Sequence, residues 1–247
     1  MRSAMLLGAA LIGCHSEIGD IEGAFYDGDH RIVHCAVDLD LIANNSLASI
    51  DGALDRAAER GEVLELYAHA PGKTVAFDTI QHVLAGARDR GLAFVTYADF
   101  ATTDVTGPGL ALSFDDHNVA PWYALRPMFE TYGARVTFFL SRYAYLQPEE
   151  YVQLRELADA GHAIEAHTVN HLRAPLYVEE RGLAAYLADE ALPSIEVLRA
   201  DGYPVHAYAY PFGARTEEID QAIHEHLPIL RSVSFTYGGV VASPCPD

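Results

Sequence analysis

The sequence has little of several things that large classes of protein depend on. Three cysteines in 247 residues are too few for a scaffold built on disulfides. Lysine and arginine total 16 against 35 aspartates and glutamates, and the net charge of −19 excludes the basic surface that nucleic acids require. No apolar run reaches the roughly 18–20 residues of a membrane span. What remains is a globular composition, 50% hydrophobic, with 12 histidines.

The N-terminus has the layout of an export signal. Arg2 precedes a short apolar stretch that ends in LIGC at residues 11–14, which is similar to the cleavage site of bacterial lipoproteins. We therefore predict a signal over residues 1–13, acylation of Cys14, a short tether over residues 14–29 and a location in the cell envelope. The only membrane contact is then the lipid anchor. A plain signal peptide, or an N-terminal strand with a buried cysteine, is the alternative.

The rest of the chain alternates strand patterns with helix patterns. Gly61, Gly91 and Gly161 each follow an amphipathic stretch and predict its end. The pattern predicts strands at 31–37, 63–69, 93–97, 109–114, 135–140, 163–166, 205–210 and 232–236, and helices at 47–60, 77–90, 123–132, 148–160, 186–200 and 217–226. Repeated strand–helix units predict a parallel sheet, open or closed into a barrel, with its chemistry at the carboxyl ends of the strands.

Two groups of polar residues follow predicted strands. Asp115 and Asp116 end an apolar strand, where neighbouring carboxylates point in different directions and can take different roles. His167 and His171 are four residues apart, a common spacing for two ligands of zinc or a related metal. Taken singly, the carboxylates are more readily explained as a helix cap or a solvated loop acid, and the histidines as surface residues. Two histidines and one carboxylate together predict a metal site with open positions for water and substrate.

Three motifs carry a resemblance to a known family. They are SFDD at 113–116, HTVNH at 167–171 and YAYPFG at 208–213, with TFFL at 137–140 between the first two. Their order and spacing resemble the polysaccharide deacetylase family, which is the NodB-homology domain of carbohydrate esterase family four. The resemblance implies a distorted (β/α) barrel of about seven strands and a hydrolase that removes acetyl groups.

The family's site residues can be carried over motif by motif. The resemblance implies that Asp115 is the catalytic base and that Asp116, His167 and His171 bind one divalent metal, with zinc first and cobalt, nickel or manganese as alternatives. The third motif, through Tyr210, Pro211 and Phe212, lines the substrate groove, and the N–H of Phe212 binds the oxyanion. Ala209 stands where the family usually has an arginine that orients the base.

The family's last motif, a strand that ends in the general-acid histidine, is absent after residue 213. Residues 63–69 resemble it, with His69 as the acid, so we predict a circular permutation. Residues 30–100 then form the usual C-terminal part and 109–247 the usual N-terminal part of one domain. Asp38 is the first choice, ahead of Asp40, for the carboxylate that pairs with His69. Cys35 and Cys245 flank the opened junction and are candidates for a disulfide.

The resemblance implies hydrolysis of N-acetyl groups on an amino-sugar polysaccharide, such as peptidoglycan, a chitin-like polymer or poly-N-acetylglucosamine. The alternatives are an O-acetyl esterase acting on a xylan-type polymer and a non-catalytic carbohydrate-binding lipoprotein on the same fold, which only Ala209 favours. We expect a monomer with no nucleic-acid partner. Five aromatic residues are candidates for stacking on sugar rings, or are ordinary core residues: Trp122, Tyr123, Tyr208, Tyr210 and Phe212.

Overall fold

Seven parallel strands close into a barrel in the computed structural model, which describes residues 17–237, 240–242 and 245. Around the ring the strands run β3, β2, β9, β8, β7, β6 and β5, and β5 pairs with β3 to close it. Their bounds are β2 Val33–Asp38, β3 Val63–Ala68, β5 Gly109–Asp116, β6 Thr137–Leu140, β7 Ala163–Ala166, β8 Ala207–Ala209 and β9 Ile229–Tyr237. The predicted (β/α) barrel is confirmed.

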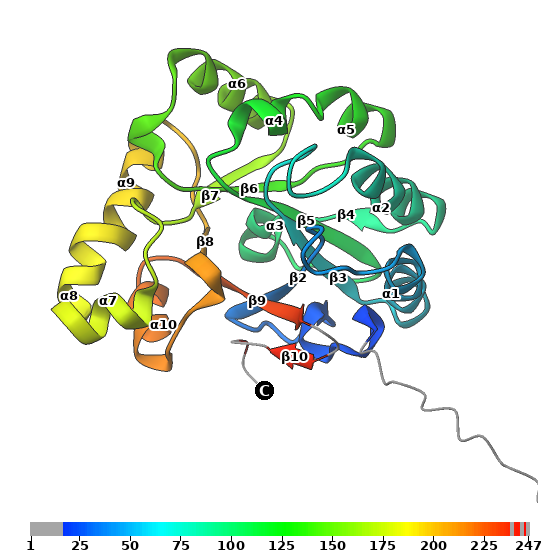
Figure 1. Ribbon diagram of the computed structural model, residues 1–247, viewed down its shortest axis with the longest axis horizontal. Coiled ribbons are helices and arrows are strands. Elements are labelled where there is room, and N and C mark those ends of the chain that lie inside the picture. The colour runs from blue at the N-terminus through cyan, green and yellow to red at the C-terminus, as the bar shows by residue number, and fades with distance from the viewer. Residues whose placement is uncertain (1–16, 238–239, 243–244, 246–247) are drawn as a thin grey trace, which may run out of the picture.

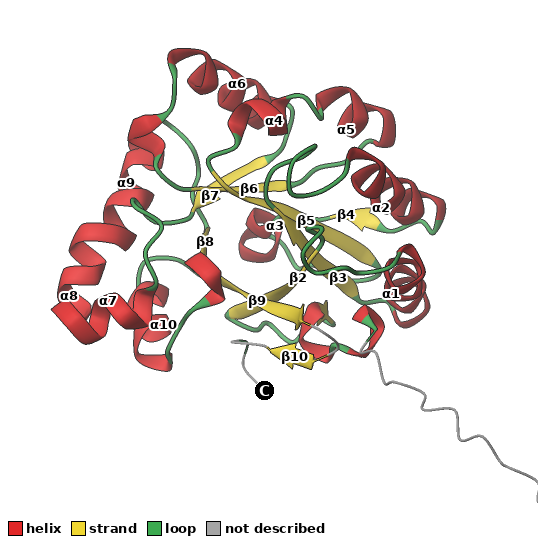
Figure 2. Ribbon diagram, in the orientation of Figure 1, coloured by secondary structure: helices red, strands yellow, loops and turns green. Residues whose placement is uncertain are grey.

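Most helices surround the strands on the outside, whereas α3 is seen within the ring of strands (Figure 1 and Figure 2). The α-helices are α1 Leu47–Arg60, α2 Phe77–Asp89, α3 Tyr97–Thr102, α4 Val119–Tyr123, α5 Arg126–Tyr132, α6 Pro148–Asp159, α7 Ala174–Arg181, α8 Leu183–Tyr186, α9 Leu192–Ala200 and α10 Glu217–His224. Short 3-10 turns lie at η1 Ile18–Asp20, η2 Glu22–Ala24, η3 Tyr143–Tyr145 and η5 Pro211–Gly213, and η4 Leu187–Ala191 is a π-helical turn. No helix in the described ranges is long and apolar enough to cross a bilayer.

Local signals explain the best-predicted elements. Helix α1 has the predicted bounds because Ser46 caps its first turn, its hydroxyl accepting from the N–H of Ser49, and because Gly61 ends it in the left-handed conformation at φ 71°. Gly109 lets two strands approach the start of β5, since a Cβ there would lie 3.1 Å from the carbonyl oxygen of Ala93 and 3.2 Å from a methyl of Val63.

Three short strands lie outside the ring. β1 Phe25–Tyr26 pairs antiparallel with β3, β4 Ala93–Phe94 pairs with the first residues of β5, and β10 Val240–Ala242 pairs with β9. The predicted strand at 93–97 is therefore too long, because its end turns into α3. Helix α7 was not predicted at all.

The two candidate cysteines are joined. Cys35 on β2 and Cys245 form a disulfide with their Cα atoms 6.0 Å apart, which ties the C-terminal segment to the barrel. The predicted signal at 1–13 and Cys14 lie outside the described residues.

Glu165 on β7 is fully buried, and its Oε2 accepts the backbone N–H groups of His206 and Ala207 at 2.7 and 2.8 Å. Its Oε1 has no partner within the described residues. Burial raises the pKa of Glu165 to about 8 from 4.5. The side chain therefore carries a proton at neutral pH, and it anchors the start of β8, the strand that leads into the third motif.

We predict that Glu165 makes stability fall as pH rises from about 5 to 8. The folded state holds the proton up to the raised pKa while the unfolded state releases it near 4.5, so the free energy of unfolding falls by up to about 1.4 kcal/mol per pH unit. Urea unfolding of wild type and Glu165→Gln across this range measures it. The amide keeps the acceptor oxygen and does not titrate, so the difference between the two proteins should grow with pH. Parallel curves would contradict the prediction.

Candidate active site

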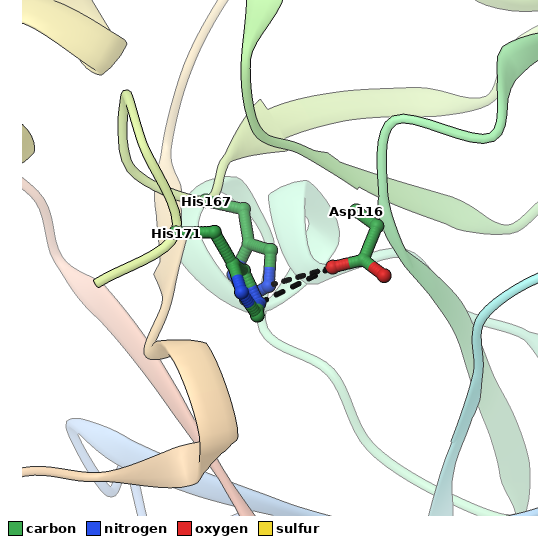
Figure 3. A group of neighbouring side chains, drawn as sticks. All are labelled: Asp116, His167 and His171. Atoms are coloured by element: carbon green, nitrogen blue, oxygen red, sulfur yellow. Dashed lines mark ion pairs between the residues drawn. The ribbon is translucent and has the colours of Figure 1, made fainter. Parts of the chain in front are cut away.

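A candidate metal triad, called the metal triad below, lies at the carboxyl ends of β5 and β7, the two strands on either side of β6. Asp116 ends β5, and His167 and His171 lie in the loop that follows β7 (Figure 3). The Oδ1 atom of Asp116 lies 3.2 Å from Nε2 of His171 and 3.9 Å from Nε2 of His167. The three side chains converge on one point, as the sequence predicts for a metal site.

These three residues fit a divalent ion. A tetrahedral ion with ligands at about 2.1 Å sets its ligand atoms about 3.4 Å apart, close to the separations observed here. The ring Nδ1–H of His167 donates to the carbonyl of Ala209 at 2.9 Å. The neutral ring is then unprotonated at Nε2, and the lone pair of this atom faces Asp116. Burial lowers the pKa of both histidines, so both offer the neutral imidazole that a metal needs.

Two residues of the triad, and a third in the loop between the histidines, are held in costly backbone conformations. Asp116, Thr168 and His171 have φ values of 85°, 68° and 63°, in the left-handed region that favours glycine. The hydroxyl of Thr168 accepts from the N–H of His171 at 2.9 Å, which fixes the loop from within. Such strain is a feature of functional sites, where the surrounding structure holds it in place.

Glu190, which the sequence analysis missed, holds the same loop from outside. It lies in the π-helical turn η4 and is buried, and its two carboxylate oxygens accept the backbone N–H and the side-chain amide of Asn170 at 2.8 and 2.6 Å. Its carbonyl oxygen accepts the N–H of Val169. π-Helical turns occur often at functional sites, and here the turn aims one carboxylate at the metal loop. Nothing in the local sequence marks that turn.

Asp115 points into the barrel and forms a buried ion pair with Arg231. Arg231 lies on β9 directly opposite Ala209 on β8, and its guanidinium also faces the rings of Tyr67 and Phe139 at 5.1 and 4.9 Å. The small side chain of Ala209 leaves room for it. An arginine is therefore not missing at this site: it comes from the neighbouring strand.

His69 follows β3, and its ring Nδ1 lies 2.5 Å from Oδ2 of Asp40. The other oxygen of Asp40 accepts from the hydroxyl of Thr74 at 2.8 Å and from the N–H of His69 at 3.2 Å. Burial opposes the charge on His69, but the hydrogen bond that its ring donates to Asp40 and the charges of the site carboxylates prevail and raise its pKa to about 9. His69 is thus a cationic acid at neutral pH.

The prediction that Asp38 pairs with His69 is wrong. The carboxylate of Asp38 accepts the backbone N–H of Asp40 at 2.8 Å, and Asp40 contacts the imidazole. Burial raises the pKa of Asp38 to about 6. Asp38 ends β2, whereas Asp40 lies in the loop beyond it, where the chain turns toward His69.

The third motif is only partly exposed. Tyr210 is fully buried, with its hydroxyl bonded to Asp220 at 2.8 Å, and Pro211 is buried too, so neither side chain lines a groove. Phe212 is 44% exposed at φ 59°, and its ring lies 4.8 Å from that of His171. Of the other aromatic candidates, Trp122 and Tyr208 are core residues. Phe212 is the member of this motif that faces solvent beside the metal triad.

Comparison with known proteins places this site in a family. A sequence model of polysaccharide deacetylases matches residues 102–227, half of the chain, and this segment carries the three motifs. The chain belongs to the polysaccharide deacetylase family. No curated protein sequence matches it significantly. The family model covers β5 to β8, and the barrel closes through β2 and β3, which precede the matched segment, and through β9, which follows it.

Solved structures share the fold at low sequence identity. The chain is similar to the deacetylase domain of BpsB from Bordetella bronchiseptica, with 13% identity, a TM-score of 0.52 and coverage of 86% of this chain and 96% of that one. It is also similar to a de-N-acetylase from Aggregatibacter actinomycetemcomitans, with 19% identity, a TM-score of 0.53 and coverage of 68% of this chain and 86% of that one. A polysaccharide deacetylase from Bacillus cereus has 18% identity and a TM-score of 0.53, with coverage of 74% of this chain and 61% of that one.

We predict that Asp40, and not Asp38, maintains the pKa of His69. In Asp40→Asn the carboxylate is lost while burial persists, so the pKa of His69 should fall by roughly 1–3 pH units. NMR titration of the imidazole in the metal-free protein measures this. Asp38→Asn is the matched control and should leave the pKa close to 9. The assignment fails if Asp38→Asn lowers the pKa and Asp40→Asn does not.

We predict that Arg231→Met leaves Asp115 as a buried charge without its ion pair. Removing one partner of a buried pair costs roughly 3–5 kcal/mol, which urea unfolding can measure. The double variant Arg231→Met with Asp115→Asn should recover most of the lost stability. It should have no deacetylase activity, because it lacks the proposed base. If the single variant is as stable as wild type, the pair does not hold Asp115 in place.

Proposed function

We propose that the protein is a metal-dependent deacetylase that hydrolyses N-acetyl groups on an amino-sugar polysaccharide. The main support is that three kinds of group lie in one site. They are the metal triad, Asp115 paired with the buried Arg231, and His69 kept protonated by Asp40. Paired acid and base groups with separate electrostatic partners are typical of acyl-transfer hydrolysis at neutral pH. Family membership supports the same chemistry.

Each catalytic group of the proposed site has one role. Asp115, oriented by Arg231, accepts a proton from the attacking water as the water oxygen bonds to the acetyl carbon. The backbone N–H of Phe212 has no acceptor within the described residues and is available to donate to the developing oxyanion. His69, oriented by Asp40, protonates the nitrogen as the carbon–nitrogen bond breaks. The products are acetate and a free amine.

A divalent ion bound by Asp116, His167 and His171 would supply a Lewis acid next to these groups. The neutral imidazoles and the separations within the triad support an ion of the zinc type. Zinc is our first choice, with cobalt, nickel and manganese as alternatives. Of the two rival functions, the binding protein loses its main support, since Arg231 stands in for the arginine absent at 209. A protonated acid also favours an amide, whose amine needs a proton to leave, over an ester.

The permuted order and the location remain proposals as well. We infer one permuted domain over residues 30–247, supported by the closure of the barrel through β2 and β3. We also propose that the protein is exported and anchored through Cys14. A disulfide between Cys35 and Cys245 is consistent with an oxidising compartment.

Acetate release tests the proposed function. The metal-loaded protein should release acetate from at least one N-acetylglucosamine polymer, and a chelator should abolish the release. His69→Ala should keep the metal and lose roughly 10²–10⁴-fold in kcat, because it removes a general acid. Asp116→Ala should lose the metal, which elemental analysis measures.

Three outcomes would contradict the proposal. Near-full activity of His69→Ala would remove the assigned acid. Acetate release from acetylated xylan alone would favour the O-acetyl esterase. No release from any polymer, with metal bound, would favour the carbohydrate-binding protein.

A further inference from the structure

A cavity of about 390 Å³ lies beside the metal triad and belongs to none of the roles assigned above. Three loops at the carboxyl ends of β5, β6 and β7 line it, through His117, Arg142, Tyr145 and Asn170. His117 adjoins the ligand Asp116 in sequence, and Asn170 adjoins His171. Its volume is in the range of small-ligand pockets, roughly 300–1,000 Å³.

Arg142 supplies the positive charge of this cavity. Most arginines in the described part of the chain pair with carboxylates, as a net charge of −19 would lead one to expect. The guanidinium of Arg142 makes no hydrogen bond or ion pair with any described residue. It is exposed and close enough to the triad for its charge to lower the pKa of His171. The guanidinium of Arg142 is therefore available to a ligand, whereas that of Arg173 lies over the ring of Phe212, 4.1 Å from its centre.

The backbone of Arg142 indicates that this side chain is needed. Its φ of 54° lies in the left-handed region, where glycine costs least and a long side chain is strained. The residue is also held firmly: its N–H donates to the carbonyl of Val169 in the metal loop at 3.1 Å, and its carbonyl accepts from Tyr145 at 2.9 Å. These two hydrogen bonds fix the backbone of Arg142 against the metal loop.

Tyr145 supplies the apolar part of the cavity. It is 68% exposed, more than almost any other large hydrophobic residue in the described chain, and it follows Arg142 within the same turn. An exposed aromatic ring next to a catalytic site is a surface for stacking on a ligand. A ring-shaped ligand with a negative substituent would satisfy both side chains.

We propose that this cavity is a subsite for a carboxylate-bearing sugar of the substrate chain, with Tyr145 against the sugar ring and Arg142 paired with the carboxylate. The inference rests on the proposed deacetylase function and narrows its substrate to an acidic glycan. Two chemistries supply such a group next to an N-acetylated sugar: a lactyl ether, as in peptidoglycan, and a uronate. An arginine fork binds either carboxylate with two parallel hydrogen bonds.

Kinetics on matched glycans tests the subsite. The probes are neutral N-acetylglucosamine oligomers, lactyl-bearing peptidoglycan chains, oligomers that alternate N-acetylglucosamine with a uronate, and the methyl esters of both acidic chains. For wild type, one acidic chain should have a KM at least about 10-fold below that of its ester, equivalent to about 1.4 kcal/mol. The favoured chain identifies the source of the carboxylate. The preference should weaken as salt is raised.

Arg142→Gly separates this role from a structural one. Glycine relieves the left-handed strain, so the variant should be at least as stable as wild type, and its KM for the acidic chains should rise more than its KM for neutral oligomers. The preference for the acid over its ester should disappear, and Arg142→Lys should restore part of it. Arg60→Ala, which removes an exposed charge at the far end of α1, is the control and should keep the full preference.

The outcomes separate the two proposals. Equal KM values for acid and ester, or equal effects of Arg142→Gly on acidic and neutral chains, would overturn the subsite and leave the deacetylase standing. No acetate from any glycan would overturn the deacetylase. Calorimetric binding of the acidic chains and their esters to the same protein then tests the cavity without turnover, and equal affinities would overturn it too.

Discussion

The site is organised around the buried ion pair between Arg231 and Asp115. Burying a charge is costly, and the cost is offset only when a partner of opposite sign lies in contact with it. Arg231 lies in the barrel interior with two of its guanidinium nitrogens lacking any hydrogen-bond partner among the described residues, so Asp115 and two aromatic faces are its compensation. Neither residue can move without leaving a charge unpaired. The pair therefore fixes the direction of Asp115, while Asp116, one residue on, faces the metal ligands.

The proposed acid, His69, is also held by an ion pair, with Asp40, nearer the surface. Asp40 has both oxygens occupied by His69 and Thr74, so the imidazole is held in place and kept protonated. Base and acid thus have separate partners, Arg231 on β9 and Asp40 in the loop after β2, and these two strands are neighbours in the ring. Barrel closure makes this arrangement possible, because it brings the carboxyl ends of β2, β3, β5 and β9 to one rim.

The remaining functional residues lie in loops whose conformations are strained and braced. The metal loop is held from within by Thr168 and from outside by Glu190 in its π-helical turn. Arg142 and Phe212 also have left-handed backbones beside this loop. Rigid loops at the rim preorganise a site for a polymer that has to enter from solvent, and they explain why an arginine occupies a position that glycine would occupy at lower cost.

The sequence alone determined what is local. Alternating strand and helix patterns predicted a parallel sheet, open or closed into a barrel. The family resemblance of the motifs added the barrel and the site residues Asp115, Asp116, His167, His171 and His69, which the structure brings into one site. The sequence did not predict which side chains from distant segments contact each other. Asp38 and Asp40 have the same side-chain type and lie two residues apart, so only the turn after β2 decided which one meets His69. Arg231 lies 116 residues from Asp115, and Tyr210 reads as exposed until the packing around it is known. Contacts of this kind depend on strand register and barrel closure, and these are decided by tertiary packing and not by any short segment of the chain.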